Sequence, residues 1–237
     1  MCDNVLTFCS LLARLKHLPR TGWVNNGVKN PESVAGHMYR MAMLVFCVDA
    51  RQEGVNFDRC IKMALVHDLA ESIVGDITPL CGVSREEKHK RELEAMANIS
   101  QLLPANVRDE VLQLFEEFEL GATREAMLVR DLDKFDMLEQ AMEYEQGENR
   151  PGELKTFFDF TLDVFTTDTV RRWAASAREK HSQFLTTDSA LVGQANAVEA
   201  PPRRIVSLGR RLIFDLAVNS NSNESNWKWR CVCEANG

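Results

Sequence analysis

The fold and the chemistry of this chain both depend on one stretch, KMALVHDLAESIVGD, at residues 62–76. An apolar run there ends in His67 and Asp68, two good metal ligands side by side. Glu71 follows four residues after His67, so on a continuous helix it would lie one turn along the same face. Asp76 comes directly after the glycine at which we expect this helix to stop. The stretch therefore directs a histidine and three carboxylates toward one region.

Such a cluster of carboxylates is repulsive and costly to bury, and a divalent cation is the simplest compensation. His37 precedes His67 by 30 residues and Asp133 follows Asp68 by 65, both in apolar helical stretches that predict inward-facing side chains. Taken singly, a histidine of this kind is more often part of the core. Together, two imidazoles and two carboxylates make a mixed nitrogen and oxygen site that suits Mn, Fe, Co, Ni or Zn better than Mg.

Apolar residues recur at three- and four-residue steps along much of the chain, whereas two-residue alternation is scarce. This periodicity predicts helices and an all-α fold. Helix ends are expected from capping and breaking residues. They are a capping box at Ser84, a first-turn proline at Pro104, glycine ends at Gly121 and Gly147, and a last helix over residues 168–183.

We expect two regions, an all-α domain at residues 4–184 and a disordered C-terminal tail at residues 185–237. Asn, Ser and a Pro-Pro pair accumulate in the tail, and such a composition does not bury a core. Residues 201–237 carry a net charge of +3, against −10 for residues 1–200. A basic docking segment is the alternative interpretation of the tail.

The whole chain of 237 residues carries a net charge of −7, which disfavours binding to nucleic acid or an anionic membrane through a basic field. Its seven cysteines include no CxxC pair, which argues for a reducing compartment and against a zinc ribbon. Cys47 and Cys60 lie in apolar contexts and are expected to be buried. The first residues are too polar for a signal peptide or a membrane span, so we expect a cytoplasmic or nuclear protein.

The remaining charged and imidazole side chains lie in patterns typical of a solvated helix surface. We expect them to be exposed and to take no part in the chemistry. They are His17, His89, His181, Glu92, Glu94 and the acidic run at residues 116–119.

Several strings, in order along the chain, resemble the HD-domain metal-dependent phosphohydrolases and, within them, the 5′-deoxynucleotidases. The strings are PRTGW at 19–23, NPESVAGHMYRMA at 30–42, ALVHDLAESIVGDITP at 64–79, EEKHKRELEAM at 86–96 and DLDKFDMLEQAMEYE at 131–145. The resemblance covers about residues 6–184 and implies the helical bundle of that family. Gly36 stands where the family usually has an acidic or polar residue; glycine weakens a helix by about 1 kcal/mol but removes no ligand.

The resemblance implies a divalent cation (Mn, Co, Mg or another transition metal) as the cofactor. Its ligands would be His37, His67, Asp68 and Asp133. Glu71 and Asp76 match acidic positions that take part in catalysis and are associated with a second cation. The backbone carbonyl of Ile77 would be a further ligand of that second cation.

Arg20 and Trp23 match the arginine and tryptophan of the family's substrate loop. Arginine is suited to hold a phosphate, because its charge is permanent and its donors form a planar fork. The indole of Trp23 would close over the sugar and leave no room for a 2′-hydroxyl. A core anchor is the alternative interpretation of Trp23.

By resemblance, the chain is an enzyme of nucleotide metabolism, a metal-dependent phosphomonoesterase that acts as a cytoplasmic homodimer. It would hydrolyse deoxyribonucleoside 5′-monophosphates to deoxyribonucleosides and phosphate through a metal-activated water, with no nucleic-acid or membrane partner. One alternative is an HD-type hydrolase of another nucleotide phosphoester. The other is a catalytically silent HD scaffold, against which the intact site residues argue.

Overall fold

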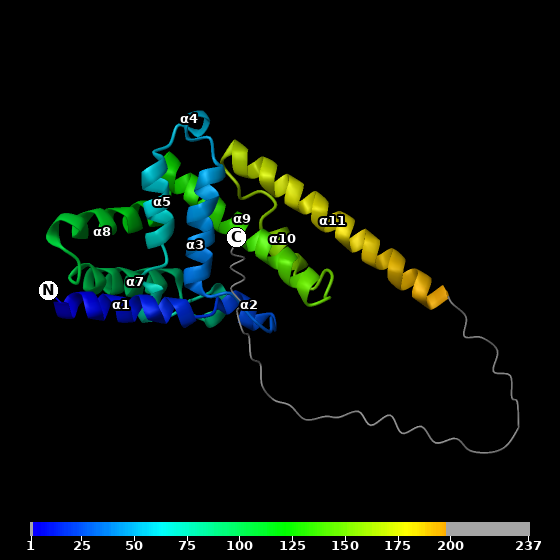
Figure 1. The fold of residues 1–237 in the computed structure, drawn as a ribbon, viewed down its shortest axis with the longest axis horizontal. Helices are drawn as coiled ribbons and strands as arrows, with labels where there is room; N and C mark the ends of the chain where they lie inside the picture. The colour runs from blue at the N-terminus through cyan, green and yellow to red at the C-terminus, as the bar shows by residue number, and fades with distance from the viewer. Residues whose placement is uncertain (1, 198–237) are drawn as a thin grey trace, which may run out of the picture. The chain divides into compact units, whose positions relative to one another are not determined.

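The computed structural model describes the backbone of residues 2–197 and the side chains of residues 2–187. The regular elements of this part are helices, which confirms the predicted all-α fold (Figure 1). Pro19 and Ser33, which lie outside the helices, form an isolated antiparallel β-bridge. The elements are α1 (Cys2–His17), α2 (Thr21–Asn25), α3 (Val34–Leu44), η1 (Val45–Cys47), α4 (Ala50–Glu53), α5 (Phe57–Val66), α6 (Glu71–Val74), η2 (Pro79–Cys81), α7 (Arg85–Ser100), α8 (Ala105–Leu120), α9 (Arg124–Gly147), α10 (Lys155–Phe160) and α11 (Asp168–Ala197).

The helix α5 lies at the centre of the bundle and packs against α3, α8 and α9. Around it, α1 packs against α3 and α6, α7 packs against α6 and α8, and α11 packs along α9 (Figure 1). The buried apolar side chains form two clusters. The first includes Ala64 of α5, and the second includes Leu69, just after α5, together with Met96 of α7. His67 and Asp68 therefore lie in the chain at the junction of the two clusters.

The helix boundaries follow the capping signals of the sequence. The hydroxyl of Ser84 accepts a hydrogen bond of 3.2 Å from the backbone N–H of Glu87, so α7 begins where the capping box predicts. Gly121 ends α8 with a φ of 64°, a left-handed conformation that favours glycine. These two predicted boundaries, and the end of α9 at Gly147, are confirmed.

The prediction of one continuous helix through residues 62–76, which include His67 and Asp68, is wrong. The helix α5 ends at Val66, and a separate short helix, α6, begins at Glu71. Between them the backbone bonds join residues three apart, such as the Glu71 N–H to the Asp68 carbonyl at 3.1 Å. A turn with this spacing places side chains i and i+3 above one another. Asp68 and Glu71 thus share a side of the chain through a tight turn and not through a regular α-helix.

The last helix is longer than predicted. It runs over Asp168–Ala197, so the expected helix end at 183 is wrong. The side chain of Leu185 approaches Gly152, where an added Cβ would lie 3.6 Å from its Cδ2. The expected tail thus begins inside a helix, because no proline interrupts the sequence before residue 201. The predicted disorder of residues 198–237 lies outside the described residues.

Three predictions of burial are wrong. His181 is buried, because it faces inward from α11: its ring stacks on Phe158 and its Nε2 lies 2.7 Å from a carboxylate oxygen of Glu145. Glu92 is buried on the inner side of α7, whereas Cys47 is exposed at the end of the short helix η1. The charged neighbours of His181 and Glu92 in the sequence occupy other faces of their helices. The other such predictions hold for His17, His89, Glu94 and Cys60. In the acidic run at 116–119, Glu116 is exposed as predicted, whereas Glu117 and Glu119 are half-buried.

Candidate metal centre

The four predicted ligands come from three segments and meet in the bundle. His37 lies in α3, His67 and Asp68 lie in the turn after α5, and Asp133 lies in α9. The Nε2 atom of His37 is 3.2 Å from Oδ1 of Asp133 and 3.9 Å from Oδ2 of Asp68. The Nε2 atom of His67 is 3.1 Å from that same Oδ2 of Asp68. The contacts between α3, α5 and α9 thus bring ligand atoms of His37, His67 and Asp133 within 4.8 Å of one another, with Asp68 beside both imidazoles.

Both histidines present a free nitrogen to this point. The Nε2 atoms of His37 and His67 are buried and have no hydrogen-bond partner in the described part of the chain. Their Nδ1 atoms are engaged elsewhere, in His37 with Asp136 at 2.7 Å and in His67 with the carbonyl of Ala64 at 2.9 Å. A donated Nδ1 proton leaves the lone pair on Nε2, which is the form that binds metal. These residues therefore fit a divalent transition-metal cation.

The support of His37 by Asp136 is a feature that the sequence reading missed. Asp136 is fully buried on α9, and its second oxygen accepts a hydrogen bond from Nε of Arg40. Arg40 follows His37 by three residues and Asp136 follows Asp133 by three. Equal i, i+3 steps on two packed helices are the signal that could have revealed this pair. Arg40 and Asp136 fix the imidazole of His37 from behind.

The charges of the cluster favour a cation among the four ligands. Burial lowers the pKa of His37, and so does Arg20, but Asp133 and Asp136 raise it to about 9. Burial alone would raise the pKa of Asp68, yet His67, Arg20 and His37 hold it well below its usual range. The carboxylates thus favour a positive charge at the imidazole of His37. A bound cation supplies that charge in place of a proton.

Arg20 closes the site from the chain segment before α2. Its Nη1 lies 3.3 Å from Asp68, and its Nη2 lies 3.7 Å from Asp133. Burial would lower the pKa of Arg20, but Asp133 and Asp68 raise it above its usual value. The guanidinium of Arg20 thus lies beside Asp68 and Asp133, the two carboxylates that also lie beside the histidines.

The two predicted catalytic carboxylates differ in their surroundings. Glu71 is 3% exposed, and its Oε2 has no hydrogen-bond partner in the described chain. Burial, together with Asp68 and Asp76, raises the pKa of Glu71 well above its usual value. Asp76 is instead tied to the segment of Arg20, because it accepts a hydrogen bond of 2.6 Å from the N–H of Thr21. Ile77 is half-buried beside it, and its role as a ligand stays a prediction.

Trp23, which the resemblance assigns to a substrate loop, lies in a helix. It belongs to the short helix α2 and is only 2% exposed. Its indole packs on Tyr144 and Phe157, with ring centroids 5.3 and 4.6 Å away. Its Nε1–H donates a hydrogen bond of 3.0 Å to Glu32. The indole is therefore packed in the core, and the core-anchor alternative describes its place in this structure.

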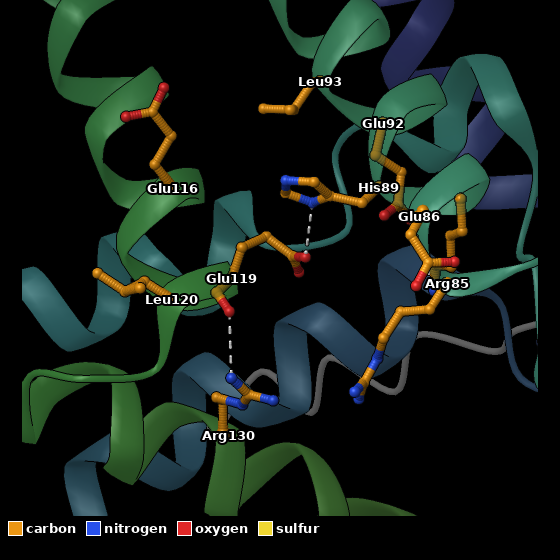
Figure 2. A pocket seen from close by; sticks show the side chains of 10 residues that line it. Arg85, Glu86, His89, Glu92, Leu93, Glu116, Glu119, Leu120 and Arg130 are labelled. Atoms are coloured by element: carbon orange, nitrogen blue, oxygen red, sulfur yellow. Dashed lines mark hydrogen bonds and ion pairs between the residues drawn. The ribbon is translucent and has the colours of Figure 1, made fainter.

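A cavity of about 870 Å³ lies between α7, α8 and α9 (Figure 2). Figure 2 shows His89 directed at Glu119, whose main-chain oxygen accepts a hydrogen bond of 3.2 Å from Arg130. Lys88 also lines the cavity and interacts electrostatically with Glu71 and the other site carboxylates. The lining residues are Arg85, Glu86, Lys88, His89, Glu92, Leu93, Glu116, Glu119, Leu120 and Arg130. Of the lining residues, Arg130 lies one turn before Asp133 on α9.

The sequence comparison agrees with this geometry, because the family model described as "HD domain" matches residues 12–179. The chain belongs to the HD domain family. This HD domain protein is 45% identical over 190 residues to the 5′-deoxynucleotidase HDDC2 of Mus musculus, covering 80% of this chain and 94% of the mouse protein. It is 44% identical over 186 residues to the 5′-deoxynucleotidase hdd1 of Schizosaccharomyces pombe, covering 76% and 92%. The predicted family is thereby confirmed.

Solved structures share the HD fold of this chain. A conserved hypothetical protein from Pyrococcus furiosus has a TM-score of 0.61 and 30% identity, covering 76% of this chain and 99% of that one. The HD domain-containing protein YGK1 of Saccharomyces cerevisiae has a TM-score of 0.56 and 27% identity, covering 77% and 87%. The helical HD bundle is thus confirmed by structure as well as by sequence.

Proposed function

We propose that this HD domain protein is a 5′-deoxynucleotidase, a metal-dependent phosphomonoesterase that converts deoxyribonucleoside 5′-monophosphates to deoxyribonucleosides and phosphate. One observation carries the proposal: two buried imidazole nitrogens without partners face Asp68 and Asp133, beside the guanidinium of Arg20. A cation and an arginine around one point suit a phosphate dianion. The relatives that are named 5′-deoxynucleotidases support the choice of substrate.

The cation would be held by His37, His67, Asp68 and Asp133. When bound, it lowers the pKa of water and neutralises charge on a phosphoryl oxygen. Arg20 binds the other phosphoryl oxygens through its planar fork and keeps the phosphorus in line for attack.

Glu71 and Asp76 move the protons of the reaction. One proton leaves the attacking water and one joins the departing 5′-oxygen. Asp76 is oriented for this work by the N–H of Thr21, and Glu71 has a buried oxygen without a hydrogen-bond partner among the described residues. The backbone carbonyl of Ile77, next to Asp76, completes the set that would hold a second cation.

The nucleoside needs room beside the phosphate, and Trp23 is not among the residues that line the cavity between α7, α8 and α9. We therefore assign the sugar to the side of Arg20 on which α2 lies. Trp23 forms a wall of the sugar site, so that a 2′-hydroxyl would be crowded or left without a partner. An unpaired buried hydroxyl costs about 1–3 kcal/mol, which corresponds to roughly tenfold to hundredfold discrimination.

The finer properties rest on the family resemblance. We propose Mn or Co as the activating ion, with Mg as a weaker one, a cytoplasmic homodimer, and no nucleic-acid or membrane partner. None of the helices within residues 2–197 is long and apolar enough to span a membrane.

Phosphate release from paired nucleotides tests the proposed function. We expect chelated protein to be inactive and to recover with added Mn or Co, with dAMP preferred over AMP. Asp68→Ala should stay inactive, whereas Asp58→Ala, the loss of an exposed aspartate in α5, should behave as wild type. Hydrolysis confined to phosphodiesters or triphosphates would favour the other HD hydrolases, and no hydrolysis with any ion would favour the silent scaffold.

A further inference from the structure

Glu32 joins the phosphate side and the sugar side of the proposed site. Its side chain accepts the hydrogen bond of 3.0 Å from the indole Nε1–H of Trp23. Its main-chain carbonyl accepts a hydrogen bond of 3.0 Å from the N–H of Arg20. Its own N–H donates a hydrogen bond of 2.7 Å to the hydroxyl of Tyr144 on α9. Three bonds in three directions fix this residue between α2 and α9.

We propose that Glu32 is a positioning residue for sugar selectivity, which holds the indole of Trp23 at a set place relative to Arg20. The inference rests on the proposed function, because it assumes that Arg20 binds the phosphate and that Trp23 borders the sugar. Glu32 itself touches neither the reacting atoms nor the four predicted metal ligands through a hydrogen bond.

The side-chain bond is the directional restraint on the indole. The other neighbours of Trp23, Tyr144 and Phe157, contact it through ring faces and edges. Such aromatic contacts tolerate sliding and tilting, whereas a hydrogen bond weakens steeply when its angle departs from linear. Loss of the Glu32 carboxylate would therefore free the indole to shift while it stays buried.

The segment of Arg20 is fixed by other contacts as well, so the effect of the Glu32 side chain falls on the indole, from which it accepts a hydrogen bond beside the two aromatic contacts. Val34 N–H donates to the carbonyl of Leu18 at 2.9 Å, next to the bridge of Pro19 with Ser33. Thr21 is held by Asp76. With the phosphate clamp anchored in this way, loss of the Glu32 side chain should change the sugar side first.

Glu32 also lies near the metal centre, so its charge has to be separated from its hydrogen bond. A carboxylate oxygen of Glu32 lies within 4.8 Å of ligand atoms of His37 and Asp136. Glu32→Gln removes the charge and keeps an acceptor for the indole, whereas Glu32→Ala removes both. Trp23→Phe removes the N–H donor and keeps an aromatic ring. Glu139→Ala is the matched control, because Glu139 lies near Asp136 on α9 and has no bond to Trp23 or Arg20.

The test is the ratio of kcat/KM for dAMP to kcat/KM for AMP. We expect Glu32→Ala to lower this ratio by about fivefold, as for one lost hydrogen bond, and Glu32→Gln and Glu139→Ala to keep it. Trp23→Phe should lower the ratio similarly, and Glu32→Ala should add nothing in the Trp23→Phe background. Equal losses in Glu32→Ala and Glu32→Gln, or additive losses in the double variant, would overturn the proposal.

A second readout does not need turnover. The indole N–H resonance of Trp23, assigned by its absence in Trp23→Phe, should exchange with solvent faster in Glu32→Ala and at the wild-type rate in Glu32→Gln. Unchanged exchange in Glu32→Ala would overturn the proposal. Wild-type protein that hydrolyses no nucleoside monophosphate would instead refute the proposed function, while the indole exchange would still decide whether Glu32 holds Trp23.

Discussion

At the scale of single residues, Asp136 is a buried side chain that orients the imidazole of His37 without being one of the four predicted ligands. It holds the Nδ1 atom of His37 and is itself held by Arg40. We expect Asp136→Asn to weaken cation binding by about 10- to 100-fold, because the amide lacks the charge that orients and polarises the imidazole. Competition with a chelating dye would measure the affinity. An unchanged affinity would show that His37 does not depend on this support.

Asp68 and Glu71 should separate metal binding from turnover. Asp68→Ala removes an anionic ligand, so both bound cation and activity should be lost. Glu71→Ala should keep the first cation and lose turnover, because the carboxylate of Glu71 makes no hydrogen bond to the four predicted ligands in the described structure. Metal content and phosphate release on the same samples would test this. Full occupancy in Asp68→Ala, or wild-type rates in Glu71→Ala, would contradict the assignments.

Glu92 should make the stability of the fold depend on pH. Burial raises its pKa from 4.5 to about 7, against the opposing effect of Lys88 and with further increases from Glu119 and Asp68. An acid that binds its proton more tightly in the folded chain stabilises the fold at low pH. This contribution is lost as pH rises from 4.5 to 7.

We therefore expect Glu92→Gln to be more stable than wild type at pH 8, by about 1 kcal/mol after solvent screening. The difference should vanish below about pH 4.5. Urea unfolding at several pH values would measure it, with Glu94→Gln as the exposed control on the same helix. A variant that is less stable than wild type at pH 8 would show that the Lys88–Glu92 pair outweighs the cost of burial.

The sequence predicted four ligands that the structure brings near one another, but not the residues that orient them. His67 and Asp68 are adjacent in the chain, and their neighbours have strong helical periodicity, so their convergence with His37 and Asp133 could be predicted. The role of Glu32 depends on its contact with Trp23 across a turn, and the roles of Arg40 and Asp136 depend on the packing of α3 against α9. Contacts between side chains that are far apart in the sequence leave no local pattern from which they could be predicted.

At the scale of elements, helix ends that depend on a capping residue could be predicted from the sequence. Breaks that depend on packing against other helices could not. Ser84 and Gly121 mark helix ends by local chemistry, and the structure has those ends. The break after α5 lies inside a sequence with good helix-forming residues. The chain turns there because Ala64, before the break, packs in the first apolar cluster. Leu69, after the break, packs in the second cluster with Met96. The burial of His181 has the same origin, because it depends on Glu145 and Phe158 of other elements.

The helix α11 should belong to the folded unit through its whole described length. It packs along α9, and Leu185 approaches Gly152 beyond the expected domain end at 184. We expect a chain ending after residue 197 to keep the melting temperature and activity of the full chain, and one ending after residue 184 to melt lower. Thermal unfolding of both would decide. Equal melting temperatures would show that the last turns contribute nothing.

At the scale of the whole molecule, the cation should stabilise the fold, because its ligands come from α3, the turn after α5, and α9. A ligand that binds only the folded chain adds about 2.7 kcal/mol of stability when present at 100 times its Kd. Chelation should therefore lower the melting temperature of wild type, and Asp68→Ala should show no such shift. The fold class itself was predictable, since helical periodicity and an ordinary soluble composition are properties of the whole chain.

The central claim is that the unpartnered nitrogens of His37 and His67, with Asp68 and Asp133, form a cation site. Titration of metal-free protein with Co²⁺, followed by its visible absorption, tests this most directly, because the spectrum reports nitrogen and oxygen ligands. We predict a saturable cobalt spectrum in wild type and in Asp58→Ala, and a much weaker one in Asp68→Ala. A wild-type spectrum equal to that of Asp68→Ala would contradict the account.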